Sequence, residues 1–149
     1  MNRKNSPGNK KLLLDTSFLL PTLGFETSDR IMKAIPKLVN YELYYSGLSI
    51  LEALWKITKK IKGTDDEIQR IADGVEAINE TMKPIIIDNE AVKNSIKMYL
   101  LGHRDMIDNL LYSIALSNKI KLLTIDTKLI EFVTKHKLPS HYIIEPENL

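Results

Sequence analysis

The chain has 149 residues, of which 44% are hydrophobic and 27% are charged, and its formal net charge is +2. This suits one globular domain with a sizeable core, and so small a net charge does not by itself indicate a nucleic-acid partner. The lack of cysteine excludes disulfide frameworks and thiolate metal sites, and no apolar run suits a membrane span or signal peptide, so we expect a cytoplasmic protein without a membrane partner.

The chain opens with a polar, basic segment, which we interpret as a flexible basic tail over residues 1–10 ahead of a single domain over 11–149. The first predicted strand follows at 11–14, where three consecutive leucines indicate a strand buried on both faces. Asp15 comes directly after this strand. A carboxylate therefore stands at the carboxyl end of a strand, where open α/β sheets bind their ligands.

Strand and helix patterns alternate along the rest of the chain. Aromatic or apolar runs predict four further strands, at 41–45, 84–87, 121–125 and 141–144. Apolar residues at helical spacing predict helices over 28–39, 46–61, 64–82, 89–101, 107–117 and 127–136. Strands that alternate with helices indicate parallel β-α units, so we expect one three-layer α/β domain with the 84–87 strand buried.

Four acidic residues fall at one edge of this predicted sheet. Asp15 and Asp126 end the first and fourth strands, and Glu52 lies early in the helix after the second strand. Asp108 lies in the first turn of the helix before the fourth strand, and Asp105, one turn earlier, is an alternative to it. The carboxyl ends of parallel strands share one edge, so we expect these carboxylates to form a cluster.

Helix capping is the structural alternative for each of these residues. Asp15, Asp105 and Asp126 each stand where a helix begins, and the run from Ser49 to Glu52 has the form of a capping box. Capping does not explain why the carboxylates converge on one edge. Like charges gathered in this way raise one another's pKa, a cost that a bound cation removes.

The cation expected at such a cluster is hard. Oxygen ligands, without cysteine or a suitably spaced histidine pair, indicate Mg²⁺ or Mn²⁺. A carboxylate site of this kind leaves coordination positions open for a phosphate group. The chemistry that it favours is hydrolysis of a phosphodiester bond.

Four motifs in this chain resemble the acidic motifs of PIN-domain nucleases, which include the VapC-like toxin ribonucleases. They occur in the family's order between about residues 11 and 144, as Leu-Leu-Leu-Asp15-Thr-Ser, Ser-Ile-Leu-Glu52-Ala-Leu, Asp108-Asn-Leu-Leu-Tyr-Ser-Ile-Ala and Leu-Leu-Thr-Ile-Asp126. The resemblance implies a three-layer α/β/α sandwich with a mainly parallel five-stranded sheet of order 3-2-1-4-5. It also implies metal-dependent hydrolysis of single-stranded RNA.

By this resemblance the four motif carboxylates are both the catalytic residues and the ligands of Mg²⁺ or Mn²⁺. The supporting side chains that it implies are Thr16, Ser17, Thr124 and Asp105. The hydroxyl residues among these are as readily interpreted as caps at strand ends. The partners implied are single-stranded RNA, a second copy of the chain in a homodimer and, where the chain is a toxin, a cognate antitoxin.

Cationic side chains near the acidic motifs are candidates for RNA binding. Arg104 adjoins Asp105 and suits a phosphate clamp, because a guanidinium binds phosphate bidentately. Lys56 and Lys59 follow Glu52 along its helix and either guide an RNA backbone or form a solvated helix face, with Glu52 and Lys56 as an i,i+4 pair.

The apolar stripe predicted for the 46–61 helix consists of Leu51, Leu54, Trp55 and Ile61. We interpret Trp55 as a residue of the core or of a subunit interface, with base stacking as the alternative.

The sequence therefore predicts a metal-dependent endoribonuclease, either the toxin of a toxin–antitoxin pair or an RNA-processing nuclease that is not a toxin. A non-catalytic scaffold that binds RNA or protein is the alternative from another class. A phosphatase with an Asp-x-Asp motif is disfavoured, because Ser17 stands at the second acidic position.

Overall fold

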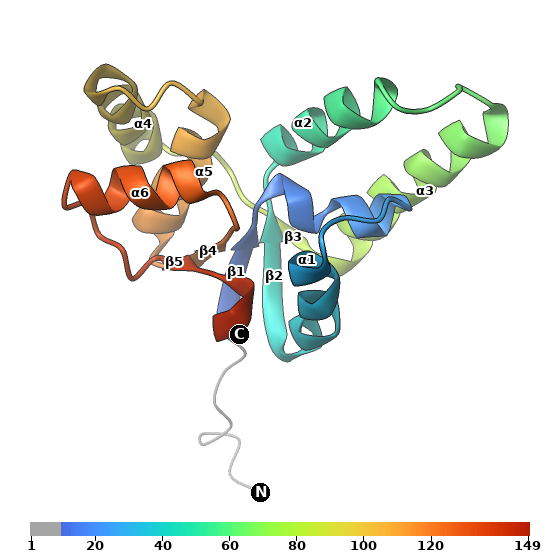
Figure 1. Ribbon diagram of the computed structural model, residues 1–149, viewed down its shortest axis with the longest axis horizontal. Helices are drawn as coiled ribbons and strands as arrows, with labels where there is room; N and C mark the ends of the chain where they lie inside the picture. Colours follow the sequence, from blue (N-terminus) through green and yellow to red (C-terminus); the bar gives the residue numbers. More distant parts are fainter. Residues whose placement is uncertain (1–9) are drawn as a thin grey trace, which may run out of the picture.

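The structure is a computed structural model that describes residues 10–149 (Figure 1). The predicted basic tail lies outside the described residues except for Lys10, which is the first residue of β1. The described strands are β1 (Lys10–Leu14), β2 (Tyr41–Tyr45), β3 (Lys83–Pro84), β4 (Lys121–Leu123) and β5 (Ile143–Ile144). The α-helices are α1 (Asp29–Ala34), α2 (Gly47–Thr58), α3 (Asp65–Thr81), α4 (Asn89–Leu101), α5 (Met106–Asn118) and α6 (Thr127–Lys135). Short 3₁₀ helices are η2 (Thr16–Phe18), η3 (Leu20–Leu23), η4 (Ile35–Asn40) and η5 (Pro146–Asn148).

The strands form one parallel sheet with the order β3-β2-β1-β4-β5. β1 is central, and Leu12 pairs with Leu43 of β2 on one side and with Lys121 of β4 on the other. The order reverses between β1 and β4, which makes this point of the sheet a topological switch point. The predicted fold and strand order are confirmed.

Leucines of β1 divide the core into two layers. Leu12 and Leu14 contribute to one buried cluster, together with residues of α1, α2 and α3, while Leu13 contributes to the other. The second cluster contains residues of α4, α5 and α6. Figure 1 accordingly shows α4, α5 and α6 on one side of β1 and α1, α2 and α3 on the other. All three leucines are buried, so the prediction of a strand covered on both faces is confirmed.

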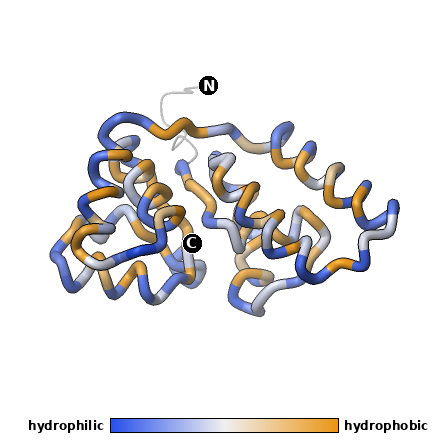
Figure 2. Tube along the Cα trace, turned by 90° about the horizontal axis from the view of Figure 1, so that it is seen from above, coloured by the Kyte–Doolittle hydropathy of each residue, from blue (hydrophilic) through white to orange (hydrophobic). Residues whose placement is uncertain are grey.

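The predicted buried strand at 84–87 is wrong. β3 is an exposed edge strand that ends at Pro84, and beyond it the N–H of Ile85 donates to the carbonyl of Tyr45. Ile86 is 78% exposed and Ile87 42% exposed. The apolar run between α3 and α4 can be followed in Figure 2 at the edge of the molecule. An apolar run has the same appearance at an edge and in the middle of a sheet, so the pattern alone did not reveal its exposure.

The apolar face of α2 also differs from the predicted stripe. Ala53 and Ile57 are buried, and Leu54 packs against the same core. Leu51 and Trp55, which lie one turn apart, are 43% and 55% exposed. The interpretation of Trp55 as a core residue is therefore wrong.

Among residues 10–149, no helix combines the length and the apolar character that a bilayer-spanning segment needs.

Candidate active site

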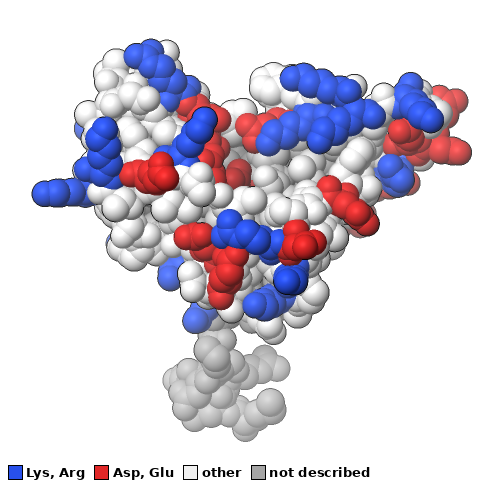
Figure 3. Space-filling view, viewed as in Figure 1, with Lys and Arg blue, Asp and Glu red and all other residues white. Residues whose placement is uncertain are grey.

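A pocket of about 220 Å³ lies at the carboxyl edge of the sheet, beside the ends of β1 and β4. Its lining includes all four motif carboxylates and consists of Asp15, Ser17, Glu52, Lys56, Asp105, Asp108, Ile125 and Asp126. The helices form two arms, one made of α4, α5 and α6 and the other, which we call the α2 arm, made of α2 and α3. Figure 3 shows acidic side chains in the hollow between these arms and basic side chains along the α2 arm. We call this hollow the acidic pocket.

Asp15 is fixed within the acidic pocket by neutral donors. It is 8% exposed; one carboxylate oxygen accepts from the N–H of Thr16 at 2.7 Å, and the other accepts from Thr124 Oγ1 at 2.7 Å. Burial raises the pKa of Asp15, the two hydrogen bonds oppose this, and the charges of Glu52 and Asp126 add to the increase. A buried carboxylate with acidic neighbours is a natural ligand for a cation.

The pKa values of Asp108 and Asp126 shift in opposite directions. Burial, the hydrogen bond to Asp126 and the charges of Asp15 and Asp105 raise the pKa of Asp108 to about 10. Burial also opposes ionisation of Asp126, but the hydrogen bonds from Asp108 and from the N–H of Leu129 outweigh it, so the pKa of Asp126 is lowered. Without a cation, Asp108 is therefore the protonated partner of an ionised Asp126.

Capping accounts for part of this carboxylate set. Asp126 accepts from Leu129 N at 3.1 Å as the N-cap of α6, and Asp105 accepts from Asp108 N at 3.1 Å as the N-cap of α5. Both also line the acidic pocket. Helix capping and a role in the acidic pocket are thus compatible at Asp105 and Asp126, because a cap uses only one carboxylate oxygen.

Glu52 reaches the acidic pocket from α2 and is not part of a capping box. The N-cap of α2 is Ser46, whose hydroxyl accepts from Leu48 N, so Ser49 and Glu52 lie inside the helix. Lys56 Nζ lies 3.7 Å from Glu52 Oε1, as the predicted i,i+4 pair. The Lys56 side chain is half exposed, and it is the only cationic side chain in the pocket lining.

The predicted hydroxyl residues divide into three cases. Thr124 is buried and bridges the site, since its hydroxyl donates to Asp15 and accepts from the N–H of Asp126 at 3.0 Å. Ser17 lines the acidic pocket. The Thr16 hydroxyl is buried without a hydrogen-bond partner among the described residues, and this residue holds Asp15 through its backbone N–H instead.

Sequence reasoning missed Asn109 and His103. Asn109 is completely buried; its Nδ2 donates to the carbonyl of His103 at 2.6 Å, and its Oδ1 lies 2.6 Å from His103 Nδ1. These contacts fix the corner that precedes α5, and the charge of His103 contributes to the lowered pKa of Asp126. The sequence does offer a signal for Asn109, because it is a polar residue directly after Asp108 in a largely apolar helix.

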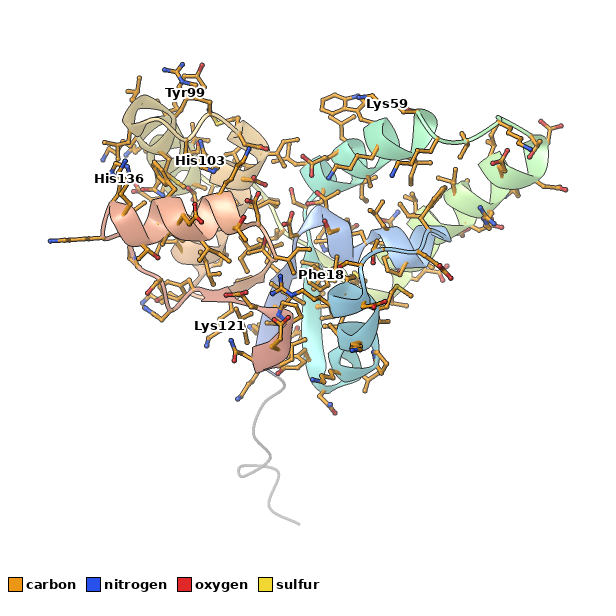
Figure 4. The ribbon with its side chains drawn as sticks, in the orientation of Figure 1. Phe18, Lys59, Tyr99, His103, Lys121 and His136 are labelled. Atoms are coloured by element: carbon orange, nitrogen blue, oxygen red, sulfur yellow. The ribbon has the colours of Figure 1, made fainter. Side chains whose placement is uncertain are left out.

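The other predicted RNA-binding cations lie outside the pocket lining. Arg104 stacks on Tyr99, with Cζ 4.9 Å from the ring centroid, and its Nη1 donates to the Tyr99 hydroxyl at 3.2 Å. Lys59 is exposed near the end of α2. In Figure 4, Lys59 and Tyr99 lie on opposite arms of the molecule. Cationic side chains therefore flank the acidic pocket on both sides.

The carboxylates suit a divalent cation chemically, although the side chains do not converge on one point. In the part of the chain that the structure describes, no three acidic or histidine side chains form a ready-made metal cluster. Mg²⁺ keeps several of its waters and binds through only one or two carboxylates. At about 30 Å³ per water, the pocket of about 220 Å³ has room for a hydrated ion.

A larger cavity, of about 530 Å³, lies at the opposite, amino edge of the sheet. It is lined by Lys10, Lys11, Lys119, Lys121 and several apolar or neutral residues, without a carboxylate. Lys121 is labelled in Figure 4. A hydrolytic site needs groups that can bind a hard cation or accept a proton, so the smaller acidic pocket is the candidate active site.

Comparisons with known proteins bear on the family and on the fold. The PIN domain family model matches residues 12–134. No curated protein sequence matches the chain.

Several solved structures share the fold. FitAcB from Neisseria gonorrhoeae is 14% identical, with a TM-score of 0.64, over 93% of this chain and 99% of that chain. A toxin–antitoxin complex from Klebsiella pneumoniae is 14% identical, with a TM-score of 0.63, over 93% and 99%. VapBC2 from Rickettsia felis, bound to a DNA fragment from its promoter, is 13% identical, with a TM-score of 0.61, over 91% and 98%.

Proposed function

Since the chain belongs to the PIN domain family, we propose that it is an endoribonuclease that uses Mg²⁺ or Mn²⁺ to hydrolyse phosphodiester bonds of single-stranded RNA. PIN domains are generally nucleases. The observation that carries the proposal is that Asp15, Glu52, Asp108 and Asp126 all line one pocket, whose lining contains a single lysine. So many carboxylates with so little compensating charge are costly unless the site binds a cation.

In this proposal one or two of the four carboxylates would bind the ion directly, and the others would bind the waters that the ion keeps. A bound Mg²⁺ or Mn²⁺ would supply Lewis-acid activation of the phosphate and would lower the pKa of water. Thr124 and the N–H of Thr16 hold the Asp15 carboxylate in one orientation, so that it does not have to reorganise during the reaction. In the metal-free pocket Asp108 favours its protonated form beside an ionised Asp126. Once a cation displaces this proton, the pair would offer a carboxylate oxygen as a proton acceptor.

The biological role that we propose is that of a toxin paired with an antitoxin. The similar solved structures include a toxin–antitoxin complex, and the chain covers nearly the whole length of the matching protein in it. Expression of the wild type should then arrest growth, and co-expression of the adjacent reading frame should relieve the arrest. An RNA-processing nuclease would cleave RNA without this effect on growth.

Cleavage of a labelled single-stranded RNA tests the enzymatic proposal. We expect cleavage with Mg²⁺ or Mn²⁺, none in EDTA, and a loss of at least a hundredfold in Asp15→Asn, which keeps the shape of the side chain and removes its charge. Asp73→Asn, at an exposed position on α3, is the matched control and should cleave like the wild type. Cleavage by Asp15→Asn at the wild-type rate would contradict the proposal.

A further inference from the structure

Trp55, the only tryptophan of the chain, presents an open ring on α2 three residues after Glu52. Its exposed fraction is 55%. Other rings have partners: Arg104 stacks on Tyr99 and Arg70 on Phe25. Over residues 10–149 no ring or cation stacks on Trp55. The buried side of α2 is formed by other residues, so folding does not explain this tryptophan.

Lysines flank the Trp55 ring and continue away from the acidic pocket. Lys56 lines the pocket, and Lys59 and Lys60 follow at exposed positions. Trp55 and Lys59 are four residues apart, so they lie on the same face of α2. Within the described part of the chain, neither Lys59 nor Lys60 forms an ion pair. Figure 3 shows this row of basic side chains along the α2 arm.

An aromatic ring beside a row of cations is the arrangement by which proteins hold single-stranded nucleic acid without reading its sequence. The ring stacks on a base, and the cations contact the backbone. A polyanion is the occupant that the charge of this face favours. An apolar protein segment would have to bury Lys59 without an ionic partner.

We propose that Trp55 stacks on a base of the RNA strand next to the phosphate in the acidic pocket, and that Lys59 contacts a phosphate one helical turn further along α2. The RNA strand then leaves the active site along this helix. This inference rests on the proposed hydrolysis of single-stranded RNA. It makes Trp55 a substrate-binding residue with little preference for sequence.

Because the chain has one tryptophan, its fluorescence reports on this position alone. The experiment titrates the full-length Asp15→Asn chain with a labelled 12-nucleotide oligoadenylate and records tryptophan fluorescence and label anisotropy together. We expect quenching that follows the anisotropy, and little quenching by duplex RNA of equal length. Trp55→Leu should bind about tenfold more weakly, and Trp55→Phe should recover most of this loss because it restores a stacking ring.

Lys59→Gln should lower the slope of log affinity against log salt by about 0.7, which corresponds to one phosphate contact with a single strand. Lys33→Gln, at an exposed position on α1, is the matched control and should leave the slope unchanged.

The outcomes separate this inference from the proposed function. If wild type cleaves RNA but Trp55 is not quenched and Trp55→Leu binds equally well, the inference is overturned and the proposed function stands. The inference is also overturned if Trp55→Leu changes only the oligomeric state, because the face would then bind protein. If the chain neither binds nor cleaves single-stranded RNA, both are overturned.

Discussion

The acidic pocket has two walls that are built in different ways. One wall, which we call the inner wall, consists of Asp15, Asp108 and Asp126, of which Asp15 and Asp108 are buried. The carboxylates of Asp15 and Asp126 each accept a hydrogen bond from a backbone N–H, and the backbone N–H of Asp108 donates to Asp105. The other, the α2 wall, consists of Glu52 and Lys56, whose side chains are 18% and 50% exposed and form only a 3.7 Å ion pair. The difference indicates that the inner wall is coupled to folding, whereas the α2 wall is free to adapt to a substrate.

The largest effect that we expect from this difference is the pH dependence of the metal-free protein. With the pKa of Asp108 raised to about 10, the native state keeps a proton that the unfolded chain loses near its ordinary value of 3.8. The stabilisation from this proton is complete below about pH 4 and is lost as pH rises, at up to about 1.4 kcal/mol per pH unit. The lowered pKa of Asp126 acts in the opposite direction, and only below its ordinary value of 3.8.

Urea unfolding in EDTA between about pH 5 and pH 8 measures this slope. Asp108→Asn should reduce the slope, because asparagine does not titrate, and the raised pKa of Asp15 accounts for the part that remains. Glu52→Gln, on the α2 wall, should keep the wild-type slope. A wild-type protein whose free energy of unfolding does not fall over this range would show that Asp108 is ionised in the native state.

A smaller effect is expected from the hydroxyl that connects the parts of the inner wall. Thr124→Val keeps the shape of the side chain but leaves one carboxylate oxygen of Asp15 and the N–H of Asp126 without a partner. We expect a loss of about 2 kcal/mol in the free energy of unfolding, and slower RNA cleavage. Thr134→Val, on exposed α6 surface, removes a comparable hydroxyl that donates to Ile130 and should cost less than about 0.5 kcal/mol. Equal losses in the two variants would contradict a special role for Thr124.

The smallest effect on stability is expected at the α2 wall. Glu52→Gln breaks only a half-exposed ion pair, so the free energy of unfolding should change by less than about 0.5 kcal/mol. RNA cleavage should nevertheless fall by at least tenfold, because the variant removes a charge from the pocket. Circular dichroism melting and a cleavage assay on the same preparation measure both quantities. A large loss of stability would place Glu52 in the structural part of the site.

The same difference explains which features could be predicted from the sequence. Asp15 and Asp126 were identifiable because each follows an apolar run that contains a strand, Asp15 directly after β1 and Asp126 three residues after the end of β4. Strand order followed only from the family resemblance, since hydrophobic periodicity does not determine which strands become neighbours. Contacts between residues far apart in the chain could not be predicted from local patterns. An example is the hydrogen bond from Thr124 to Asp15, which are 109 positions apart.

The incorrect predictions have a common physical cause. A local pattern does not reveal the tertiary surroundings of a residue. The pattern around Ile86 therefore predicts a buried strand, and that around Trp55 allows a place in the core, although both side chains are exposed. Likewise, Ser49 to Glu52 has the form of a capping box, but Ser46 caps α2 three residues earlier. The helix begins at Gly47, and the pattern of apolar residues does not indicate this starting point.

Calorimetric titration of the full chain with Mn²⁺ tests most directly whether the acidic pocket is a metal centre. Measured at pH 7.5 in two buffers with different ionisation enthalpies, binding should release up to one proton per ion, because Asp108 must lose its proton. Asp15→Asn should bind Mn²⁺ at least tenfold more weakly, while Asp73→Asn should bind like the wild type. Wild type and Asp15→Asn with the same isotherm, or no binding by either, would contradict the account.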